Sequence, residues 1–404
     1  MNRVTIIGGG TAGWLSAIYI KKKYTNYKIS IVESSNIGIL GAGEGSTPNL
    51  KELLVSGFGF NEGDFLNKVN GTKKYGITFE GWNNDVNHSF VHGFDDGVES
   101  NELYSYHFNA RLFAEYLKEF ALNIGVEYID NEIKDFKLVD NKVSKILFED
   151  SSIIDTDFVI DCSGFKRLII GNLYKEKWKS YESELIVNSA VPFFLTQDKV
   201  DEYPKTIAKA VEHGWVWQIP LQDRWGCGYI FSDKHTNETD VIEEINRMFG
   251  DKISTINKPI KFNAGCYENV WIENCISIGL SGGFLEPLEA TSIMTAIVQL
   301  KNLPNDIFDY SKRDGYNKLV RDINYQNMLF IRHHYNCSRD DSNFWKEYKN
   351  MSLPNQLTKI YNTPTTLNSI SDILDINHKN IVFSLAQYMW IYTNNFIKKA
   401  NHLI

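Results

Sequence analysis

A cluster of glycines near the start of the chain has the spacing of a phosphate-binding turn. Residues 4–7 predict a short apolar strand, and residues 8–13, Gly-Gly-Gly-Thr-Ala-Gly, follow it directly. In this pattern Gly8 makes a tight turn, Gly10 lets a pyrophosphate approach the backbone, and Gly13 lets the next helix pack on the strand. The start of that helix offers free N–H groups and a positive dipole end to phosphates. The stretch predicts a dinucleotide site formed by Gly8, Gly10, Thr11, Ala12 and Gly13.

An acidic residue at a fixed distance supports this interpretation. Residues 28–33 (KISIVE) predict a second strand, and Glu33 at its end lies 20 residues after Gly13. A carboxylate at this spacing meets a ribose hydroxyl of the adenosine in a βαβ nucleotide site. The simplest alternative is a glycine-rich turn that binds no ligand.

The uncharged run of 17 residues from 4 to 20 also has the look of a signal peptide or a membrane span. Three consecutive glycines break such a helix, the run is short for a span, and no small-residue cleavage site precedes the lysines at 21–23. We therefore interpret the run as a nucleotide-binding strand and turn, and we expect no membrane segment here.

Two further glycine turns, at residues 161–165 and 279–283, favour FAD over NAD as the dinucleotide, and each follows a predicted strand. Another glycine-rich loop covers residues 41–45. Ligands of open α/β sheets lie at such strand ends. Because a flavin needs extra loops for its ribityl chain and ring system, we add these positions to the predicted cofactor site: Gly41, Ala42, Gly43, Glu44, Gly45, Asp161, Gly164 and Gly279.

Two other sets of side chains invite a chemical interpretation. Trp215 and Trp217 are two residues apart and share one face of a predicted strand, where they could line a pocket or belong to an apolar core. His333 and His334 are adjacent, but neighbouring histidines on a helix diverge and no third ligand is evident. We predict no metal site, and packing or surface roles for both histidines.

The elements that position these residues indicate an α/β fold. We expect a Rossmann-like, glutathione-reductase-like FAD-binding module over residues 1–302, interrupted by a β-rich insertion on the substrate side at about 166–261. Residues 303–404 have a helical composition and predict a C-terminal subdomain. Within the first module, apolar residues at helical spacing predict a helix over residues 104–123.

Composition excludes some classes of function. The 404 residues include 43% hydrophobic and 23% charged residues, typical of an ordinary globular protein, and the net charge is −8. An acidic balance argues against nucleic acid or an anionic membrane as partner. The five cysteines are scattered, which fits a reducing compartment, so a cytoplasmic location is expected.

Four longer motifs together resemble the flavin-dependent halogenases of the tryptophan-halogenase type. They are GGGTAGW at 8–14, GAGEGSTP at 41–48, GWVWQIP at 214–220 and GGFLEPLEATS at 282–292. The resemblance spans the chain from residue 1 to about 350, and Trp-x-Trp-x-Ile-Pro is its most specific part. It implies that reduced FAD, oxygen and a halide produce hypohalous acid, which passes to a separate pocket holding an electron-rich aromatic substrate.

The resemblance also implies roles for individual residues. Lys74, in the sequence NGTKKYGITF, would capture or hydrogen-bond the oxidised halogen, with Lys73 as the competing assignment. Glu289 would orient that species or take the proton that the arene loses, with Glu286 as the alternative acid and a helix-capping carboxylate as the ordinary role. The remaining implied roles are halide binding by the backbone of Thr291 and Ser292, and shielding of the flavin by Trp215 and Trp217.

Some properties stay open at this point. Glu289-Ala290-Thr291-Ser292 stands where the tryptophan-acting enzymes read Glu-Ser-Thr-Gly, so the halide and the arene are not determined, nor is the oligomeric state. No second nucleotide fingerprint for NAD(P)H is present, which implies a separate NAD(P)H-dependent flavin reductase and diffusible FADH2. The alternative functions are a flavin-dependent aromatic monooxygenase that hydroxylates its substrate, and a non-catalytic flavin-binding protein.

Overall fold

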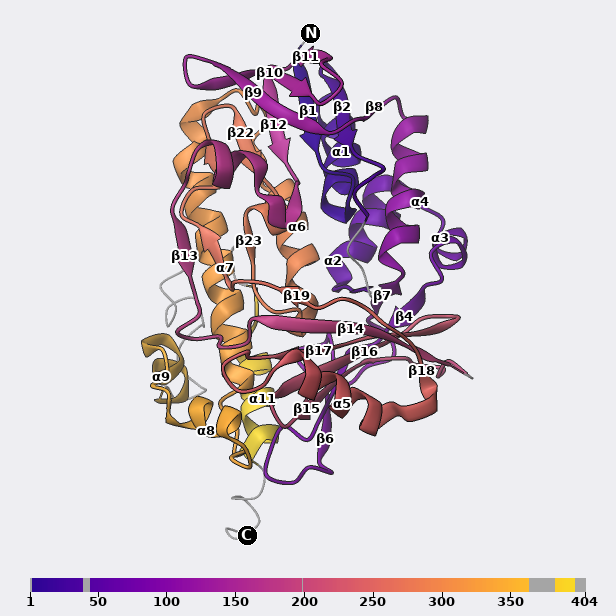
Figure 1. Cartoon of the computed structure of the whole chain (residues 1–404), viewed down its shortest axis with the longest axis vertical. Helices are drawn as coiled ribbons and strands as arrows, with labels where there is room; N and C mark the ends of the chain where they lie inside the picture. The colour runs from indigo at the N-terminus through magenta and orange to yellow at the C-terminus, as the bar shows by residue number, and fades with distance from the viewer. Residues whose placement is uncertain (1, 39–43, 198, 363–381, 397–404) are drawn as a thin grey trace.

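A mostly parallel sheet forms the upper half of the molecule in Figure 1. The computed structural model describes residues 2–38, 44–197, 199–362 and 382–396. The neighbouring strands of this sheet all run parallel except β21, which pairs antiparallel with β22. In spatial order the strands are β21 (Trp271–Ile272), β22 (Cys275–Ser277), β12 (Phe158–Asp161), β1 (Arg3–Ile7), β2 (Lys28–Glu33) and β8 (Glu127–Asp130).

Helices cover this sheet, which explains the apolar character of its strands. In β1, Val4 and Ile6 are fully buried and Ile7 is nearly so, as expected for a central parallel strand. The helix α1 (Thr11–Lys23) follows β1 and packs against α4 (Ala110–Asn123) and α6 (Thr291–Lys301). The predicted α/β class and Rossmann-like βαβ unit are therefore confirmed.

The strand register brings the predicted cofactor turns to one edge of the sheet. Ile7 at the end of β1 pairs with Asp161 at the end of β12 and with Val32 near the end of β2. Gly8 and Glu33 come next along their strands, and the Gly8 N–H donates to the Val32 carbonyl at 2.8 Å. The carboxyl ends of parallel strands are where such folds bind ligands.

A second, eight-stranded and mainly antiparallel sheet forms the lower half of Figure 1. It combines strands from within the range 166–261 with two earlier ones, because β5 and β6 join its edge. In spatial order the strands are β18 (Ile253–Ile256), β14 (Ser189–Thr196), β17 (Arg224–Phe231), β16 (Gly214–Pro220), β15 (Thr206–Val211), β5 (Ile77–Glu80) and β6 (Ser89–His92), with β19 (Ile260–Lys261) on β14.

Three small sheets complete the β structure, and one of them corrects the predicted helix over 104–123. Residues 105–108 form strand β7, and α4 begins only at Ala110, where the Asn109 side chain accepts hydrogen bonds from the N–H groups of Arg111 and Leu112. The strands are β3 (Glu44–Gly45), β7 (Ser105–Phe108) and β4 (Thr72–Lys74); β11 (Ile153–Asp155), β10 (Lys142–Phe148) and β9 (Ile133–Val139); and β13 (Trp178–Ser180), β20 (Gly265–Tyr267) and β23 (Gly283–Phe284).

The C-terminal part is helical over its described residues, as predicted. The helix α7 (Arg313–His334) runs from the level of the parallel sheet to that of the lower sheet (Figure 1), and α11 (Leu385–Phe396) packs against it. No helix within the described ranges is long and apolar enough to cross a membrane. The other helices are α2 (Pro48–Lys51), a π-helix (Glu52–Phe58), α3 (Glu62–Lys68), α5 (Glu238–Phe249), α8 (Asn343–Asn350) and α9 (Asn355–Asn362).

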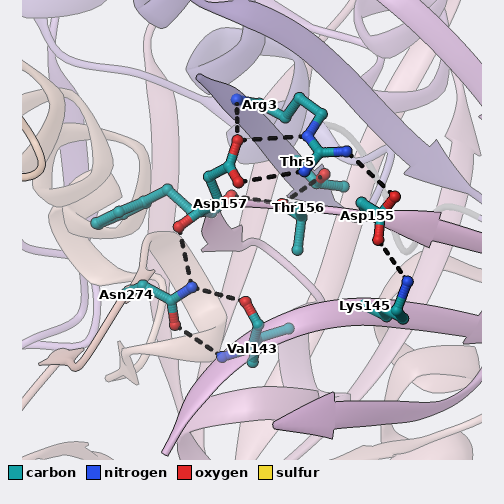
Figure 2. Close-up of polar contacts among 9 residues, drawn as sticks. Arg3, Thr5, Val143, Lys145, Asp155, Thr156, Asp157 and Asn274 are labelled. Carbon is teal, nitrogen blue, oxygen red and sulfur yellow. Dashed lines mark hydrogen bonds and ion pairs between the residues drawn. The ribbon is translucent and has the colours of Figure 1, made fainter. Parts of the chain in front are cut away.

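A buried amide joins the small sheet of β9 to β11 to the parallel sheet (Figure 2). The Asn274 side chain is 2% exposed; its Oδ1 accepts from the Val143 N–H at 2.9 Å, and its Nδ2 donates to the carbonyls of Val143 at 2.7 Å and Asp157 at 3.0 Å. Nearby, the exposed Lys145 contacts Asp155 at 2.6 Å. A buried network of this kind contributes more to stability than an exposed ion pair.

Replacing Asn274 with leucine should therefore lower the free energy of unfolding by roughly 2 to 4 kcal/mol, because it leaves buried backbone groups without partners. The matched change Lys145→Ala, which removes the exposed ion pair, should leave the urea unfolding midpoint nearly unchanged. Urea unfolding followed by circular dichroism measures both. Equal shifts for the two variants would contradict this interpretation.

Candidate active site

A cavity of about 1020 Å³ connects the edge of the parallel sheet with one face of the antiparallel sheet. At one end it is lined by residues of the glycine-rich turn after β1. At the other end it is lined by Lys74 and by the segment before α6. Between these ends the indoles of Trp215 and Trp217 form part of the wall. The residues that different motifs predicted separately therefore share one cavity.

The glycine-rich end has the geometry of a dinucleotide site. A Cβ at Gly8 would lie 2.3 Å from the Cys162 carbonyl oxygen, and a Cβ at Gly13 would lie 1.8 Å from the Gly8 carbonyl oxygen, so both positions require glycine for packing. Gly8 also has a φ of 106°. At Gly10 no atom lies within 4 Å of the Cβ position, which leaves open space beside the N-terminus of α1. This is the space that a pyrophosphate needs.

The predicted ribose acceptor lies beside this turn. The Glu33 side chain packs on Gly9, where a Cβ would come within 2.3 Å of its carboxyl carbon. Its Oε2 lies 3.4 Å from the Lys118 Nζ, and the carboxylate lines the cavity. Lys118 is itself held over the Tyr128 ring, 3.5 Å from its centroid. Glu33 is thus fixed where it can accept a hydrogen bond from a ribose hydroxyl.

The other predicted cofactor residues divide into three groups. Thr11, Ala12, Gly164 and Gly279 line the cavity, as do Glu44 and Gly45. The Asp161 carboxylate does not; it is fully buried and accepts hydrogen bonds from the N–H groups of Ser163 at 3.0 Å and Ile169 at 2.9 Å, so it shapes the turn after β12. Gly41, Ala42 and Gly43 lie outside the described residues.

Glu44 places a weakly acidic carboxyl group on the cavity wall. It lies in β3, opposite Phe108 of β7, and burial raises its pKa to about 7. Gly45 follows, and a Cβ there would lie 3.2 Å from the Lys74 Nζ. The small residue at 45 therefore lets the flavin-binding loop and the lysine strand approach each other closely.

The two tryptophans lie on the cavity face of β16, as their spacing predicts. Their ring centroids are 6.3 Å apart, whereas Val216 between them packs into the core on the opposite face of the sheet. The Trp217 ring lies over Gly228, where a Cβ would come within 2.0 Å of the indole. Both indoles therefore line the cavity and are more than ordinary core residues.

The structure separates the two candidate lysines. Lys74 is 1% exposed and lines the cavity. Lys73 points the opposite way; its side chain is 37% exposed and its Nζ lies 3.7 Å from Glu62 Oε2 and 4.3 Å from the Tyr104 ring centroid. Alternation along β4 explains the difference, since neighbouring side chains of a strand face opposite sides. Lys74 is the lysine of the cavity.

Burial changes the acidity of Lys74 and of its neighbour His107. Burial lowers the Lys74 pKa to about 8, and the negative charge of Glu289 opposes this change. Burial, together with the charge of Lys74, holds the His107 pKa well below its ordinary value. His107 accordingly serves as a neutral ring between two hydroxyls, with Thr72 Oγ1 at 3.0 Å and Thr206 Oγ1 at 2.9 Å.

Glu289 enters the cavity from a backbone turn that non-glycine residues rarely adopt. Glu289 has a φ of 67° and Ala290 a φ of 55°, both in the left-handed region, immediately before α6. The Glu289 residue is 7% exposed, and its Oε1 lies 2.8 Å from His92 Nδ1 and 2.9 Å from His334 Nε2. Burial acts to raise the Glu289 pKa, but the two imidazoles outweigh it and hold that pKa well below its ordinary range.

The alternative acid, Glu286, faces away from the cavity. It is fully buried, and its Oε2 accepts hydrogen bonds from Trp215 Nε1 at 2.9 Å and from the Tyr335 hydroxyl at 2.6 Å. Burial raises the Glu286 pKa to about 7. Its contacts make it a support for the Trp215 indole, whereas of the two candidate acids Glu289 is the one that lines the cavity.

The segment after Glu289 provides backbone N–H groups at the start of a helix. Thr291 is the first residue of α6, and Ala290 and Ser292 line the cavity. Free N–H groups and the helix dipole favour an anion at this position. Thr291 and Ser292 therefore lie where a halide could bind to the backbone.

Sequence reasoning missed three residues of the site: His92, His107 and His334. The expectation that both histidines at 333 and 334 have packing roles is wrong for His334, which contacts Glu289, whereas His333 packs against Tyr361 and the Tyr388 carbonyl. Potential ligand atoms of His92, Glu289 and His334 lie within 4.8 Å of one another, a group that does not include His333. No local sequence pattern marks His92 or His107. The adjacent histidines at 333 and 334 were the one sequence feature that drew attention to His334.

The chain is similar over most of its length to known proteins. Residues 3–103 and 95–399 match the family described as tryptophan halogenase. The 7-chloro-L-tryptophan 6-halogenase KtzR of Kutzneria sp. (strain 744) is 28% identical over 431 residues, covering 88% of this chain and 83% of the relative. Among solved structures, the tryptophan 6-halogenase SttH of Streptomyces toxytricini has a TM-score of 0.87 at 26% identity, covering 96% of this chain and 89% of that chain. BrvH, a flavin-dependent halogenase from Brevundimonas sp. BAL3, has a TM-score of 0.85 at 27% identity, covering 98% and 90%.

Burial of the Lys74 charge should reduce stability. The change Lys74→Met keeps the shape of the side chain and removes the charge, so it should raise the free energy of unfolding at pH 7 by roughly 2 to 3 kcal/mol. The pKa of Lys74 is about 8 in the folded protein and near 10.5 in the unfolded chain. The increase in the free energy of unfolding should therefore be full below pH 8 and shrink as the pH rises toward 10.5. Urea unfolding at several pH values measures it, and a loss of stability at pH 7 would contradict the assignment.

The role of Glu286 can be tested by its shape and charge. Glu286→Gln keeps an oxygen that accepts from both Trp215 and Tyr335, so its stability at pH 5 should match the wild type within about 1 kcal/mol. Glu286→Leu leaves both donors buried without an acceptor and should cost roughly 2 to 4 kcal/mol. Urea unfolding monitored by tryptophan fluorescence compares the three proteins.

The same variants give a dependence on pH. The Glu286 pKa is raised in the folded state, so the stability that its protonated form contributes should be lost as the pH rises toward 7. The unfolding free energy of the wild type relative to Glu286→Gln should therefore fall between pH 5 and 7 and then level off. A constant difference over this range would show that Glu286 is ionised throughout.

Proposed function

The chain belongs to the tryptophan halogenase family, and on this premise we propose that it halogenates an electron-rich aromatic molecule beside Lys74 and Glu289. One observation carries the proposal. The dinucleotide turn, the two indoles and this buried lysine and carboxylate line a single cavity. A halogenase needs this arrangement, because its oxidant is made at one place and used at another.

Family membership implies a flavin and a halide, and the residues present fit FAD. The turn at residues 8–13 and the start of α1 would hold the pyrophosphate, Glu33 the ribose, and Gly164 and Gly279 would border the rest of the cofactor. When bound in its reduced form, FAD supplies with oxygen the two-electron oxidation of the halide to hypohalous acid. The backbone N–H groups of Thr291 and Ser292 would hold the halide as an anion.

Trp215 and Trp217 would shield the flavin from the organic substrate. Their indoles line the same cavity as the dinucleotide turn and Lys74, and in this role they would let a halide or hypohalous acid pass where an aromatic molecule does not. Shielding of this kind keeps the arene from the oxidising end. It also keeps the oxidant inside the protein until it reaches Lys74.

Lys74 would bind hypohalous acid and activate it. At pH 7 the amine is mostly protonated, since its pKa is about 8, and it can donate a hydrogen bond to the oxygen of the acid. As the arene attacks the halogen, the carbon–halogen bond forms, the oxygen–halogen bond breaks, and its electron pair goes to oxygen. Lys74 then gives the oxygen a proton, and water leaves.

Glu289 would take the proton that the halogenated carbon loses. Its buried carboxylate also stabilises the positive charge on the ring before that proton leaves. The protonated Glu289 can return the proton to the neutral Lys74, which resets both groups. The balance is one arene and one hypohalous acid consumed, with one halogenated arene and one water formed.

The substrate and the halide are narrower questions. Two of the proteins quoted above, KtzR and SttH, are described as halogenases of 7-chlorotryptophan and tryptophan, so indoles are the first arenes to test, and phenols the second. Because Ala290 and Ser292 flank the proposed anion site, halide preference should be measured with chloride, bromide and iodide. With a single nucleotide fingerprint in the sequence, we propose that a separate NAD(P)H-dependent reductase supplies the FADH2.

Lys74 and Lys73 provide a matched pair of variants for this proposal. Lys74→Ala should reduce halogenated product at least about a hundredfold, while reduced flavin is still consumed by oxygen. Lys73→Ala should retain product formation within about twofold, because its side chain points to solvent and pairs with Glu62. Product is measured by mass spectrometry with FAD, a reductase, NADH, halide and the arene panel. Full activity of Lys74→Ala would refute the role of the lysine.

The same assay distinguishes the alternative functions. Incorporation of oxygen without halogen by the wild type would support a hydroxylase, and an unchanged panel of arenes together with no FAD binding would support a non-catalytic protein. Halogenated product that depends on added halide supports the proposal.

A further inference from the structure

Glu289 and the two histidines beside it form a hydrogen-bond network whose protons can be counted. His334 Nδ1 lies 2.7 Å from the Phe330 carbonyl oxygen, and its Nε2 lies 2.9 Å from Glu289 Oε1. His92 Nδ1 lies 2.8 Å from the same Oε1. His92, Glu289 and His334 are each less than 9% exposed, so the protein itself must supply the protons for these contacts.

The count shows that the pair of His334 and Glu289 holds an extra proton. A backbone carbonyl can only accept, so His334 Nδ1 carries a hydrogen. The contact between His334 Nε2 and Glu289 Oε1 needs a second hydrogen, since two lone pairs at 2.9 Å repel. A neutral His334 beside an ionised Glu289 does not provide it. His92 needs no extra proton, because a neutral ring with its hydrogen on Nδ1 satisfies its contact.

The surrounding charges determine where the extra proton lies. Lys74 also faces Glu289, and its positive charge favours the ionised carboxylate. His333, next to His334 on α7, remains neutral, since burial and then the charge of His334 lower its pKa to about 3. The buried Arg332 points toward the Tyr348 carbonyl, and His107, on the far side of Lys74, is neutral.

The low pKa of Glu289 agrees with the proton residing on His334. Burial alone acts to raise that pKa, and the two histidines reverse the effect. Within the described part of the chain, both side-chain hydrogen bonds of Glu289 use Oε1, and Glu289 lines the cavity. Its second oxygen, Oε2, is therefore the atom free to meet a ligand.

We propose that His334 is a positioning residue of the halogenation site: as an imidazolium held by the Phe330 carbonyl, it keeps Glu289 ionised and leaves Oε2 to take the proton from the arene. This inference rests on the proposed function. The ring carbon that carries both halogen and hydrogen is a strong acid, so a weakly basic carboxylate can accept its proton. What the reaction requires is that the carboxylate stays ionised although it is buried.

The charge of His334 is separable from its hydrogen bond. In His334→Gln the amide nitrogen can still donate to Glu289 Oε1, but the positive charge is gone. The Glu289 pKa should then rise, because burial is no longer outweighed. His333→Gln is the matched control, since His333 is the neighbouring buried histidine on α7 and contacts Tyr388 instead of Glu289.

The measurement is the pH profile of kcat for halogenated arene between pH 5 and 8, at saturating halide and arene. For His334→Gln, kcat at pH 5 divided by kcat at pH 8 should be at least about tenfold lower than the same ratio for the wild type. The ratio for His333→Gln should match the wild type within about twofold. An unchanged ratio for His334→Gln overturns the inference.

A second measurement does not depend on activity or on the folding of the His334 and His333 variants. In ¹⁵N-histidine NMR spectra of the FAD-loaded protein at pH 8.5, one buried histidine should have both ring nitrogens protonated. His235, which also contacts a carboxylate, Glu347, is replaced with glutamine to remove a competing signal. Spectra that contain only neutral rings overturn the inference, as does a stoichiometric divalent metal ion in the purified protein, which would use the same nitrogens.

The outcomes separate this inference from the proposed function. If the wild type forms no halogenated arene, the proposed function fails whatever the NMR spectra show. If the wild type halogenates but His334 is neutral at pH 8.5, the proposed function stands and the role of His334 fails.

Discussion

A carboxylate buried next to the end of a cavity is the constraint on which the rest of the site depends. Glu289 is 7% exposed, and an ionised group at this depth is unstable unless positive or hydrogen-donating groups surround it. His92 from β6 and His334 from the end of α7 meet one of its oxygens, and Lys74 from β4 faces it. The antiparallel sheet and the long helix must therefore be placed correctly before the carboxylate can exist in its reactive form.

Several features of the site lower stability and are explained by function. Glu289 and Ala290 both have left-handed backbone conformations, which cost roughly 1 to 2 kcal/mol each in non-glycine residues. Lys74 is buried without a carboxylate in direct contact, and Glu44 and Glu286 have raised pKa values. A fold selected for stability alone would avoid this combination. The large apolar cores of the two sheets offset it, and the charges remain where an oxidised halogen and an arene would need them.

Local sequence patterns were sufficient to predict the glycine-rich turn and the neighbouring Glu33, and the family resemblance pointed to Lys74. Neither indicated the histidines around Glu289. The glycines and Glu33 belong to one strand–helix–strand unit, so their positions follow from residues that are close in the chain. His92 and His334 are 242 positions apart and meet only because β6 and α7 pack around the same turn. Asp161 shows the opposite error: its place at a strand end was predicted correctly, but its carboxylate is used by the N–H groups of the following turn. The strand at 105–108 was missed because tertiary pairing with β3 and β4 overrides its helical pattern.

The central claim is that the oxidised halogen travels inside the protein, from the dinucleotide turn past the indoles to Lys74. The most direct test adds a methionine-rich protein, too large to enter a cavity of about 1020 Å³, to the complete reaction as a scavenger of free hypohalous acid. The wild type should form the same amount of halogenated arene with and without a large excess of scavenger, and the scavenger's methionines should stay reduced. A yield of halogenated arene that falls in proportion to the added scavenger would contradict the claim, because it would place the halogenation in bulk solution.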